Sequence, residues 1–207
     1  TFHGMILDPG RLDLVLELTR SAASLLEPGN LPDELQAFAD AGEETPLIEL
    51  DALRSLPEGT LGRRFADHMD RQGFAPEDLE HALPEGELAL VSQHLQRRHD
   101  VHHILTGFST DIPGEIGLQA FYLANFRALP AQALIAAVML RPLVVGGTDN
   151  DETEAVMDAI VAGWQQGRAA SCLFGIDWSA HWSRPLEAVQ ADFNLRDPAC
   201  GPTPASA

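Results

Sequence analysis

The sequence predicts a mainly α-helical protein built as one domain. Three observations lead to this prediction. Long segments repeat their apolar residues at the three- and four-residue spacing of a helix, strand-like alternation is almost absent, and 45% of the 207 residues are apolar. A chain of this length and composition can bury a full core without disulfide bonds. We expect one helical domain over residues 1–196 and a flexible tail over residues 197–207.

The first predicted helices are separated by glycine and proline. Residues 11–26 place leucine, valine and alanine mostly on one helical face before a Pro-Gly break. Residues 32–42 predict a short helix with an acidic first turn and a glycine stop. Residues 45–74 predict two helices on either side of a break at residues 57–59.

Four longer helices are predicted next. Residues 87–107 end at a glycine, and residues 113–129 begin at a proline. A third helix runs from residue 131 to about residue 145. Residues 149–168 begin with acidic residues, end with a basic one and carry an apolar stripe. The short segment 171–178 is the strand candidate of the chain.

Charge and motif content exclude several classes of protein. The formal charge is −18, with 31 acidic and 13 basic residues, and such a chain does not bind a nucleic-acid backbone. Cys172 and Cys200 have no zinc-finger spacing, and we interpret them as ordinary reduced cysteines. The start shows no secretory or transit signal, and the apolar stretch 133–147 is shorter than the ~20 residues that span a bilayer. We expect a soluble, cytoplasmic protein that is able to meet a membrane surface.

Three of the eight histidines fall within five positions. On a helix, His99 and His103 share one face, and two imidazoles at this spacing can bind one divalent metal. Asp100 is rotated by about 100° from His99 and is either a third ligand or an acceptor that fixes a histidine tautomer. Glu115 lies in the first turn of the next predicted helix, and antiparallel packing would fold it back toward the histidines. Mixed nitrogen and oxygen ligands suit zinc, iron, manganese or cobalt better than calcium.

A simpler interpretation stays open, because two histidines at helical spacing also occur without a metal. The nearby aspartate and glutamate favour the metal site. His102 lies between the other two histidines and points away from their shared face. We therefore expect His102 not to be a ligand, although it is able to bind an outer charge.

The motif resembles the signature of a known family, that of the fourth Coq protein of ubiquinone (coenzyme Q) biosynthesis. The signature is the order His-Asp-x-x-His, eleven residues and then Glu, which here runs from His99 to Glu115. Three stretches of the chain are similar to this family in matching order, and the likeness covers about residues 45–195, while residues 1–44 add little. The stretches are residues 56–79, 99–121 and 167–195. The extra histidine at 102 and the basic pair Arg97-Arg98 depart from the family pattern.

The resemblance implies a helical metalloprotein that acts on a prenylated ring. It implies one divalent metal (zinc, iron, cobalt, manganese or magnesium) and replacement of the carboxyl group at ring carbon 1 of a prenylated hydroxybenzoate by a hydroxyl group. It also implies an apolar channel for the polyprenyl tail, although ordinary core packing explains most of the apolar residues after the motif. The implied metal ligands and catalytic residues are His99, Asp100, His103 and Glu115; the expected channel residues are Phe121, Tyr122, Phe126 and Met139.

The resemblance also implies partners and a place in the cell. We expect a polyprenylated aromatic substrate, contact with other ubiquinone-biosynthesis proteins and a homodimer, and no nucleic acid. We expect a bacterial member at the inner face of the cytoplasmic membrane, or the matrix side of the inner mitochondrial membrane in a eukaryote. The alternative is a non-catalytic, prenyl-lipid-binding scaffold with a structural metal. A structural site would more often be closed by cysteine and histidine. An unrelated metal hydrolase ranks lower, because no additional general base is evident.

Overall fold

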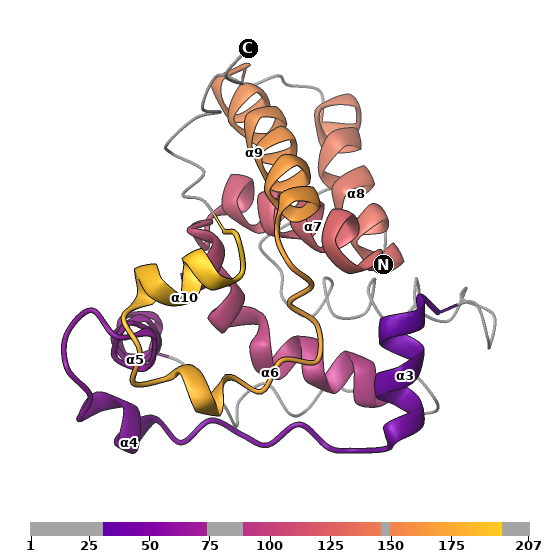
Figure 1. Ribbon diagram of the computed structural model, residues 1–207. Helices are drawn as coiled ribbons and strands as arrows, with labels where there is room; N and C mark the ends of the chain where they lie inside the picture. The colour runs from indigo at the N-terminus through magenta and orange to yellow at the C-terminus, as the bar shows by residue number, and fades with distance from the viewer. Residues whose placement is uncertain (1–30, 74–88, 146–149, 196–207) are drawn as a thin grey trace, which may run out of the picture.

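Helices account for nearly all regular structure in the computed structural model, which describes residues 31–73, 89–145 and 150–195 (Figure 1). Within these ranges there are eight α-helices, one short 3₁₀ helix and no strand. The prediction of a mainly α-helical single domain is confirmed. The helix predicted over residues 11–26 and the tail predicted over residues 197–207 lie outside the described residues.

Three helices come before the histidine motif: α3 (Asp33–Ala41), α4 (Leu50–Arg54) and α5 (Leu61–Gln72). Helices α3 and α5 each end at a glycine in the left-handed conformation that glycine favours, with φ of 69° after α3 and 70° after α5. The predicted break at residues 57–59 separates α4 from α5. These three helices confirm the order predicted from the glycine and proline positions.

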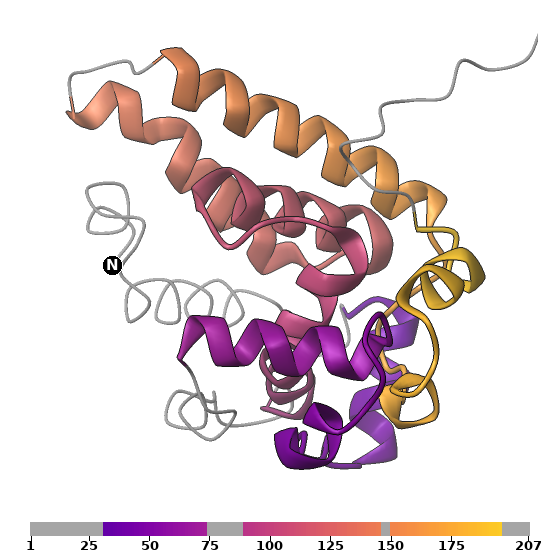
Figure 2. The same ribbon diagram turned by 90° about the vertical axis from the view of Figure 1, so that its left-hand side faces the viewer.

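Four longer helices form the rest of the framework: α6 (Ala89–Thr106), α7 (Ile112–Phe126), α8 (Leu129–Val145) and α9 (Asn150–Ala169). Each begins and ends within three residues of its predicted bounds. Figure 2 shows α9 and α8 lying over α7, and Figure 1 shows α6 running beneath them between α5 and α3. The helix α6 thus connects the group of α7, α8 and α9 to the helices α3 and α5.

The strand candidate over residues 171–178 does not form a strand. The Asn125 side chain binds this segment, because its amide oxygen accepts from the Leu173 N–H at 2.9 Å and its amide nitrogen donates to the Ser171 carbonyl at 3.1 Å. An asparagine side chain from α7 thus replaces the neighbouring strand that a ladder requires. The segment runs into a 3₁₀ helix (Trp178–His181), and the short helix α10 (Leu186–Asp192), which was not predicted, follows after a proline.

The contact between α7 and α9 depends on glycine. A Cβ atom added to Gly163 on α9 would lie 2.0 Å from the carbonyl oxygen of Gly117 on α7, and one added to Gly167 would lie 2.5 Å from the carbonyl oxygen of Phe121. Any larger residue at these positions would collide with backbone. The two helix backbones can therefore approach each other more closely than ordinary side chains allow.

His94 connects α6 to two non-helical segments. Its Nε2 accepts from the Gly175 N–H at 3.1 Å, so the ring proton lies on Nδ1 and is donated to the Thr45 hydroxyl at 2.8 Å. The rings of Phe38 and Phe174 pack against it with centroids 4.7 and 4.9 Å away. Burial, and secondly the nearby Arg98 charge, lower the pKa of His94 to about 4.

This depressed pKa predicts acid sensitivity of the fold. Between the unfolded pKa of about 6.5 and the folded pKa of about 4, the unfolded chain binds a proton that the folded chain does not. The stabilising effect is complete above pH 6.5 and decreases by on the order of 3 kcal/mol as the pH falls through this range. Urea unfolding of wild type and His94→Gln at several pH values measures it, and the free energy of unfolding of the variant should fall less steeply. Equal slopes would contradict the assignment.

Candidate metal centre

Two histidines of α6 and one glutamate of α7 converge on a single point. The Nε2 atoms of His99 and His103 lie 3.1 Å apart. The two oxygens of the Glu115 carboxylate lie 3.2 Å from these nitrogens, one oxygen facing each ring. One ligand atom from each of the three residues lies within 4.8 Å of the others, which makes the group a candidate for holding a metal ion.

The turn between α6 and α7 brings Glu115 to the histidines, as the sequence predicted. Gly107 ends α6 with a φ of 81°. Asp111 caps α7, because its side chain accepts from the Gly114 N–H at 2.9 Å. A Cβ added to Gly114 would lie 2.0 Å from the Ser109 carbonyl oxygen, so the turn requires glycine there. Glu115 follows directly and points back toward α6.

In both histidines Nδ1 makes a hydrogen bond away from the shared point, and Nε2 faces that point. His103 Nδ1 lies 2.9 Å from the Phe108 carbonyl oxygen, which only accepts, so the proton of the neutral ring lies on Nδ1. Its Nε2 then carries a free lone pair toward the shared point. His99 presents its Nδ1 to the Tyr122 hydroxyl at 3.3 Å in a similar way. Outer hydrogen bonds of this kind are typical of metal-binding histidines, and the donor set fits a divalent transition metal.

The positive charge of His99 and the negative charge of Glu115 stabilise each other. Burial by itself would raise the pKa of Glu115, but the His99 charge and the contacts of both histidine rings with the carboxylate oxygens hold it well below its usual range. Burial likewise opposes a charge on His99, and the Glu115 carboxylate outweighs this and raises the pKa of His99. A proton and a metal ion therefore compete for the same nitrogen.

Asp100, the remaining residue of the motif, lies beside this group rather than within it. Its carboxylate lies 3.5 Å from Nε2 of His68 on α5, and the His68 ring stacks over His103 with centroids 6.4 Å apart. Burial would raise the pKa of Asp100, but the neighbouring His68 ring and the charge of His99 lower it. His68 was missed from the sequence, where its signal was a histidine three residues after Phe65 on the apolar face of α5.

His102 points away from the shared point, as predicted. It is fully buried, and its Nδ1 lies 2.9 Å from the Tyr122 hydroxyl. Its ring also packs edge-on against Tyr122 and Trp178. Burial first, and then the charge of neighbouring histidines and Arg98, lower the pKa of His102 well below its usual value, so the ring is neutral.

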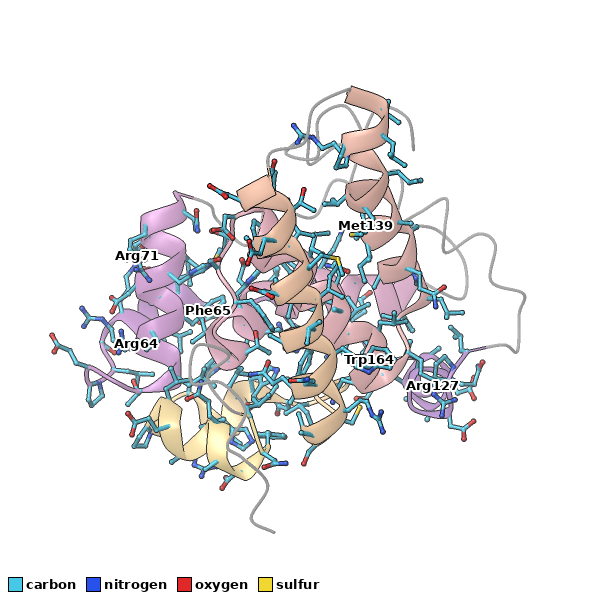
Figure 3. All side chains as sticks on the ribbon, turned by 90° about the horizontal axis from the view of Figure 1, so that it is seen from above. Arg64, Phe65, Arg71, Arg127, Met139 and Trp164 are labelled. Carbon is cyan, nitrogen blue, oxygen red and sulfur yellow. The ribbon has the colours of Figure 1, made fainter. Side chains whose placement is uncertain are left out.

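The four predicted channel residues are in different environments. Phe121 and Phe126 are buried in the main core, and Tyr122 lies against the histidines. Met139 is 40% exposed on α8. It belongs to a set of exposed apolar side chains on α8 and α9, and Figure 3 labels one from each helix, Met139 and Trp164. We call this set the apolar surface; its members are Leu129, Met139, Leu140, Leu143, Val144, Met157, Val161 and Trp164.

No helix in the described part of the chain combines the length and apolar character needed to cross a membrane.

The family match and the similar proteins found for this chain all point to ubiquinone biosynthesis proteins. Residues 43–199 match the family described as "Coenzyme Q (ubiquinone) biosynthesis protein Coq4". A mitochondrial ubiquinone biosynthesis protein of Coprinopsis cinerea is 29% identical over 203 residues, which cover 93% of this chain and 67% of the relative. Its counterpart in Talaromyces stipitatus is 27% identical over 208 aligned positions, or 94% and 69% of the two chains.

A solved structure shares the fold. It is the crystal structure of a Nostoc punctiforme protein that is described, provisionally, as a ubiquinone biosynthesis protein. The TM-score is 0.62 at 22% sequence identity, and the match covers 86% of this chain and 80% of the other.

Proposed function

Since the chain belongs to the Coq4 family of coenzyme Q (ubiquinone) biosynthesis proteins, we propose that it catalyses oxidative decarboxylation of a prenylated hydroxybenzoate at ring carbon 1. The observation that carries the proposal is the convergence of His99, His103 and Glu115 on one point. Two imidazoles and a carboxylate form a set of three ligands, which catalytic metal sites use because further positions stay open to substrate. Structural sites are more often closed by four cysteine and histidine ligands.

The reaction exchanges one ring substituent for another. The bond from the ring to its carboxyl group breaks and carbon dioxide leaves. One oxygen atom of dioxygen enters the ring as the hydroxyl group, and the other becomes water with two electrons and two protons from a reductant. A redox-active divalent metal, when bound, supplies the Lewis acidity and the electron exchange that this chemistry needs.

The residues of the chain have separate roles in this proposal. His99, His103 and Glu115 hold the metal. Asp100 lies beside the two histidines, and its negative charge stabilises a cation bound there. His68 lies with Nε2 3.5 Å from that carboxylate and can orient it.

The apolar surface is the proposed site for the polyprenyl tail. Its members are large and exposed on α8 and α9, whereas Phe121 and Phe126 already fill the core. Exposed apolar groups of this kind mark sites of lipid or protein contact. We place Met139 in this tail site, and a second copy of the chain is the other occupant that the same surface suits. Because a polyprenyl tail dissolves in lipid, we also propose that the protein meets a membrane surface. Other ubiquinone-biosynthesis proteins are the proposed protein partners.

Replacing Met139 by aspartate tests the tail site. We expect the affinity for the prenylated acid to fall by about 10-fold or more, because burying one methionine side chain contributes about 1.5–3 kcal/mol. The affinity for the unprenylated acid should stay the same. Isothermal titration with both acids, together with the mass of wild type and variant by light scattering, separates loss of tail binding from loss of a dimer. Equal weakening for both acids would exclude a tail site at Met139.

The activity itself is tested by carbon dioxide release. Purified protein loaded in turn with iron, manganese, cobalt or zinc is incubated with carboxyl-labelled prenylated hydroxybenzoate, dioxygen and a reductant. Metal-dependent release with formation of the hydroxylated ring supports the enzyme. Tight binding of metal and prenylated acid without release under all these conditions would instead support the alternative, a non-catalytic scaffold that binds prenyl lipids.

A further inference from the structure

Behind His99 lies a short chain of buried polar groups. We propose that Tyr122 and His102 are positioning residues that hold His99 in the tautomer able to bind a metal through Nε2. This inference rests on the metal site of the proposed function and extends it to two residues outside the sequence motif. Its parts are a tyrosine of α7 and a histidine of α6 that points away from the shared point of the metal ligands.

The three side chains form a continuous hydrogen-bonded series. The Tyr122 hydroxyl lies 3.3 Å from His99 Nδ1 and 2.9 Å from His102 Nδ1. Tyr122 and His102 are 4% and 0% exposed, so bulk water does not replace either contact. His99 meets the hydroxyl with one ring nitrogen and the Glu115 carboxylate with the other. Any change at the hydroxyl therefore reaches the proposed metal ligand through a single ring.

The direction of these bonds decides whether His99 can bind a metal. A neutral imidazole carries one proton, and a nitrogen that binds a metal carries none. Metal binding at His99 Nε2 thus places the proton on Nδ1, which donates to the Tyr122 oxygen. The Tyr122 O–H is then free to donate to His102 Nδ1. In the reverse direction, His102 donates to Tyr122, Tyr122 donates to His99 Nδ1, and the His99 proton occupies Nε2 and blocks the metal.

A buried atom of His102 supports a specific role for this residue. Its Nε2 is buried and has no hydrogen-bond partner among the described residues. A buried polar atom without a partner costs about 1–3 kcal/mol, and an apolar residue of similar size would avoid this cost. The benefit that remains to a histidine here is the bond from Nδ1 to the Tyr122 hydroxyl. Packing alone would be served at least as well by leucine.

The test uses Tyr122→Phe, which removes the hydroxyl and retains the ring. Zinc(II) affinity is measured by competition with a chromophoric chelator in the absence of substrate, and we expect a loss of about 10-fold to 100-fold. The matched control is Thr106→Val, which removes a different buried hydroxyl, on α6. This hydroxyl donates to the His102 carbonyl at 2.7 Å and not to an imidazole. The control should bind zinc as wild type does.

A tautomer measurement excludes a merely structural effect. In ¹⁵N-histidine-labelled, metal-free wild type, NMR should show the proton of the neutral His99 ring on Nδ1. In metal-free Tyr122→Phe the proton should move toward Nε2, where the Glu115 carboxylate accepts it. His102→Leu provides a second variant, in which the Tyr122 hydroxyl turns its hydrogen to His99 Nδ1, and it should also weaken zinc binding.

The outcomes separate this inference from the proposed function. Wild-type zinc affinity and an unchanged His99 tautomer in both Tyr122→Phe and His102→Leu would overturn the inference and leave the metal site standing. Absence of zinc binding by wild type would overturn both. Weaker zinc binding in both variants supports the inference whether or not wild type releases carbon dioxide.

Discussion

Replacing His103 by alanine will remove metal binding and, with it, release of carbon dioxide. In the proposed metal site His103 supplies one of the three donor atoms, and its ring is held in place by the Phe108 carbonyl at 2.9 Å. Alanine offers no ligand, and the remaining histidine and carboxylate form a weak pair. We expect the affinity for metal to fall by more than about 100-fold, beyond the effect of losing an outer hydrogen bond. Metal analysis by mass spectrometry of protein purified without an affinity tag measures the metal content.

The control for His103→Ala is His94→Ala. Both substitutions remove a buried histidine of α6 and leave former hydrogen-bond partners unpaired, so both reduce the free energy of unfolding. His94 makes no contact with the metal ligands, and its variant should retain about one metal per chain. Loss of metal in both variants would attribute the effect to general destabilisation. Full turnover in folded His103→Ala would contradict the proposed site.

Gly163→Ala should destabilise the protein strongly, although the same change stabilises most helices. Alanine in a helix interior is favoured over glycine by about 1 kcal/mol. Here the added Cβ would lie 2.0 Å from the Gly117 carbonyl oxygen and 3.1 Å from the Phe121 backbone nitrogen. Backbone atoms cannot rotate out of the way, so α7 and α9 must separate. We expect a loss of about 3 kcal/mol, measured as the free energy of unfolding in urea.

The same variant should weaken metal binding at a distance. Glu115 and Tyr122 lie on α7, on either side of Gly117, and a shift of α7 moves both of them relative to α6. An exposed substitution on α9, Gln165→Ala, serves as the control and should change neither the stability by more than about 0.5 kcal/mol nor the affinity for zinc. Unchanged or increased stability in Gly163→Ala would show that the two helices adjust without cost.

Local sequence information predicted the helices and part of the site. Long periodic segments with a glycine or proline at their ends, such as those of α6 and α7, require no knowledge of distant residues. The return of Glu115 to His99 and His103 was predictable because only one turn connects the two helices. The helix α10 is seven residues long, which is too short for a clear apolar period, and it was missed.

Contacts between distant elements were not predictable in this way. The pairing of Asp100 with His68 depends on how α5 packs against α6, which no local pattern specifies. The apolar residues after the motif cover more than one face of their helices, so the sequence alone could not separate core residues such as Phe121 from surface residues such as Met139. Tyr122 was assigned to the tail from its apolar ring, while its hydroxyl lies against His99.

The short connection between α6 and α7 also has a consequence for the order in which the protein assembles. The three ligands lie within a segment of about 17 residues, and closing a loop of this size costs little chain entropy compared with joining distant segments. Helices that are neighbours in sequence also form their contacts early in folding. A metal ion can therefore meet a complete set of ligands before α9 has docked through its glycines. We therefore expect metal capture at the proposed site and completion of the fold to be separable events, with metal present during synthesis acting as a template for the turn between α6 and α7.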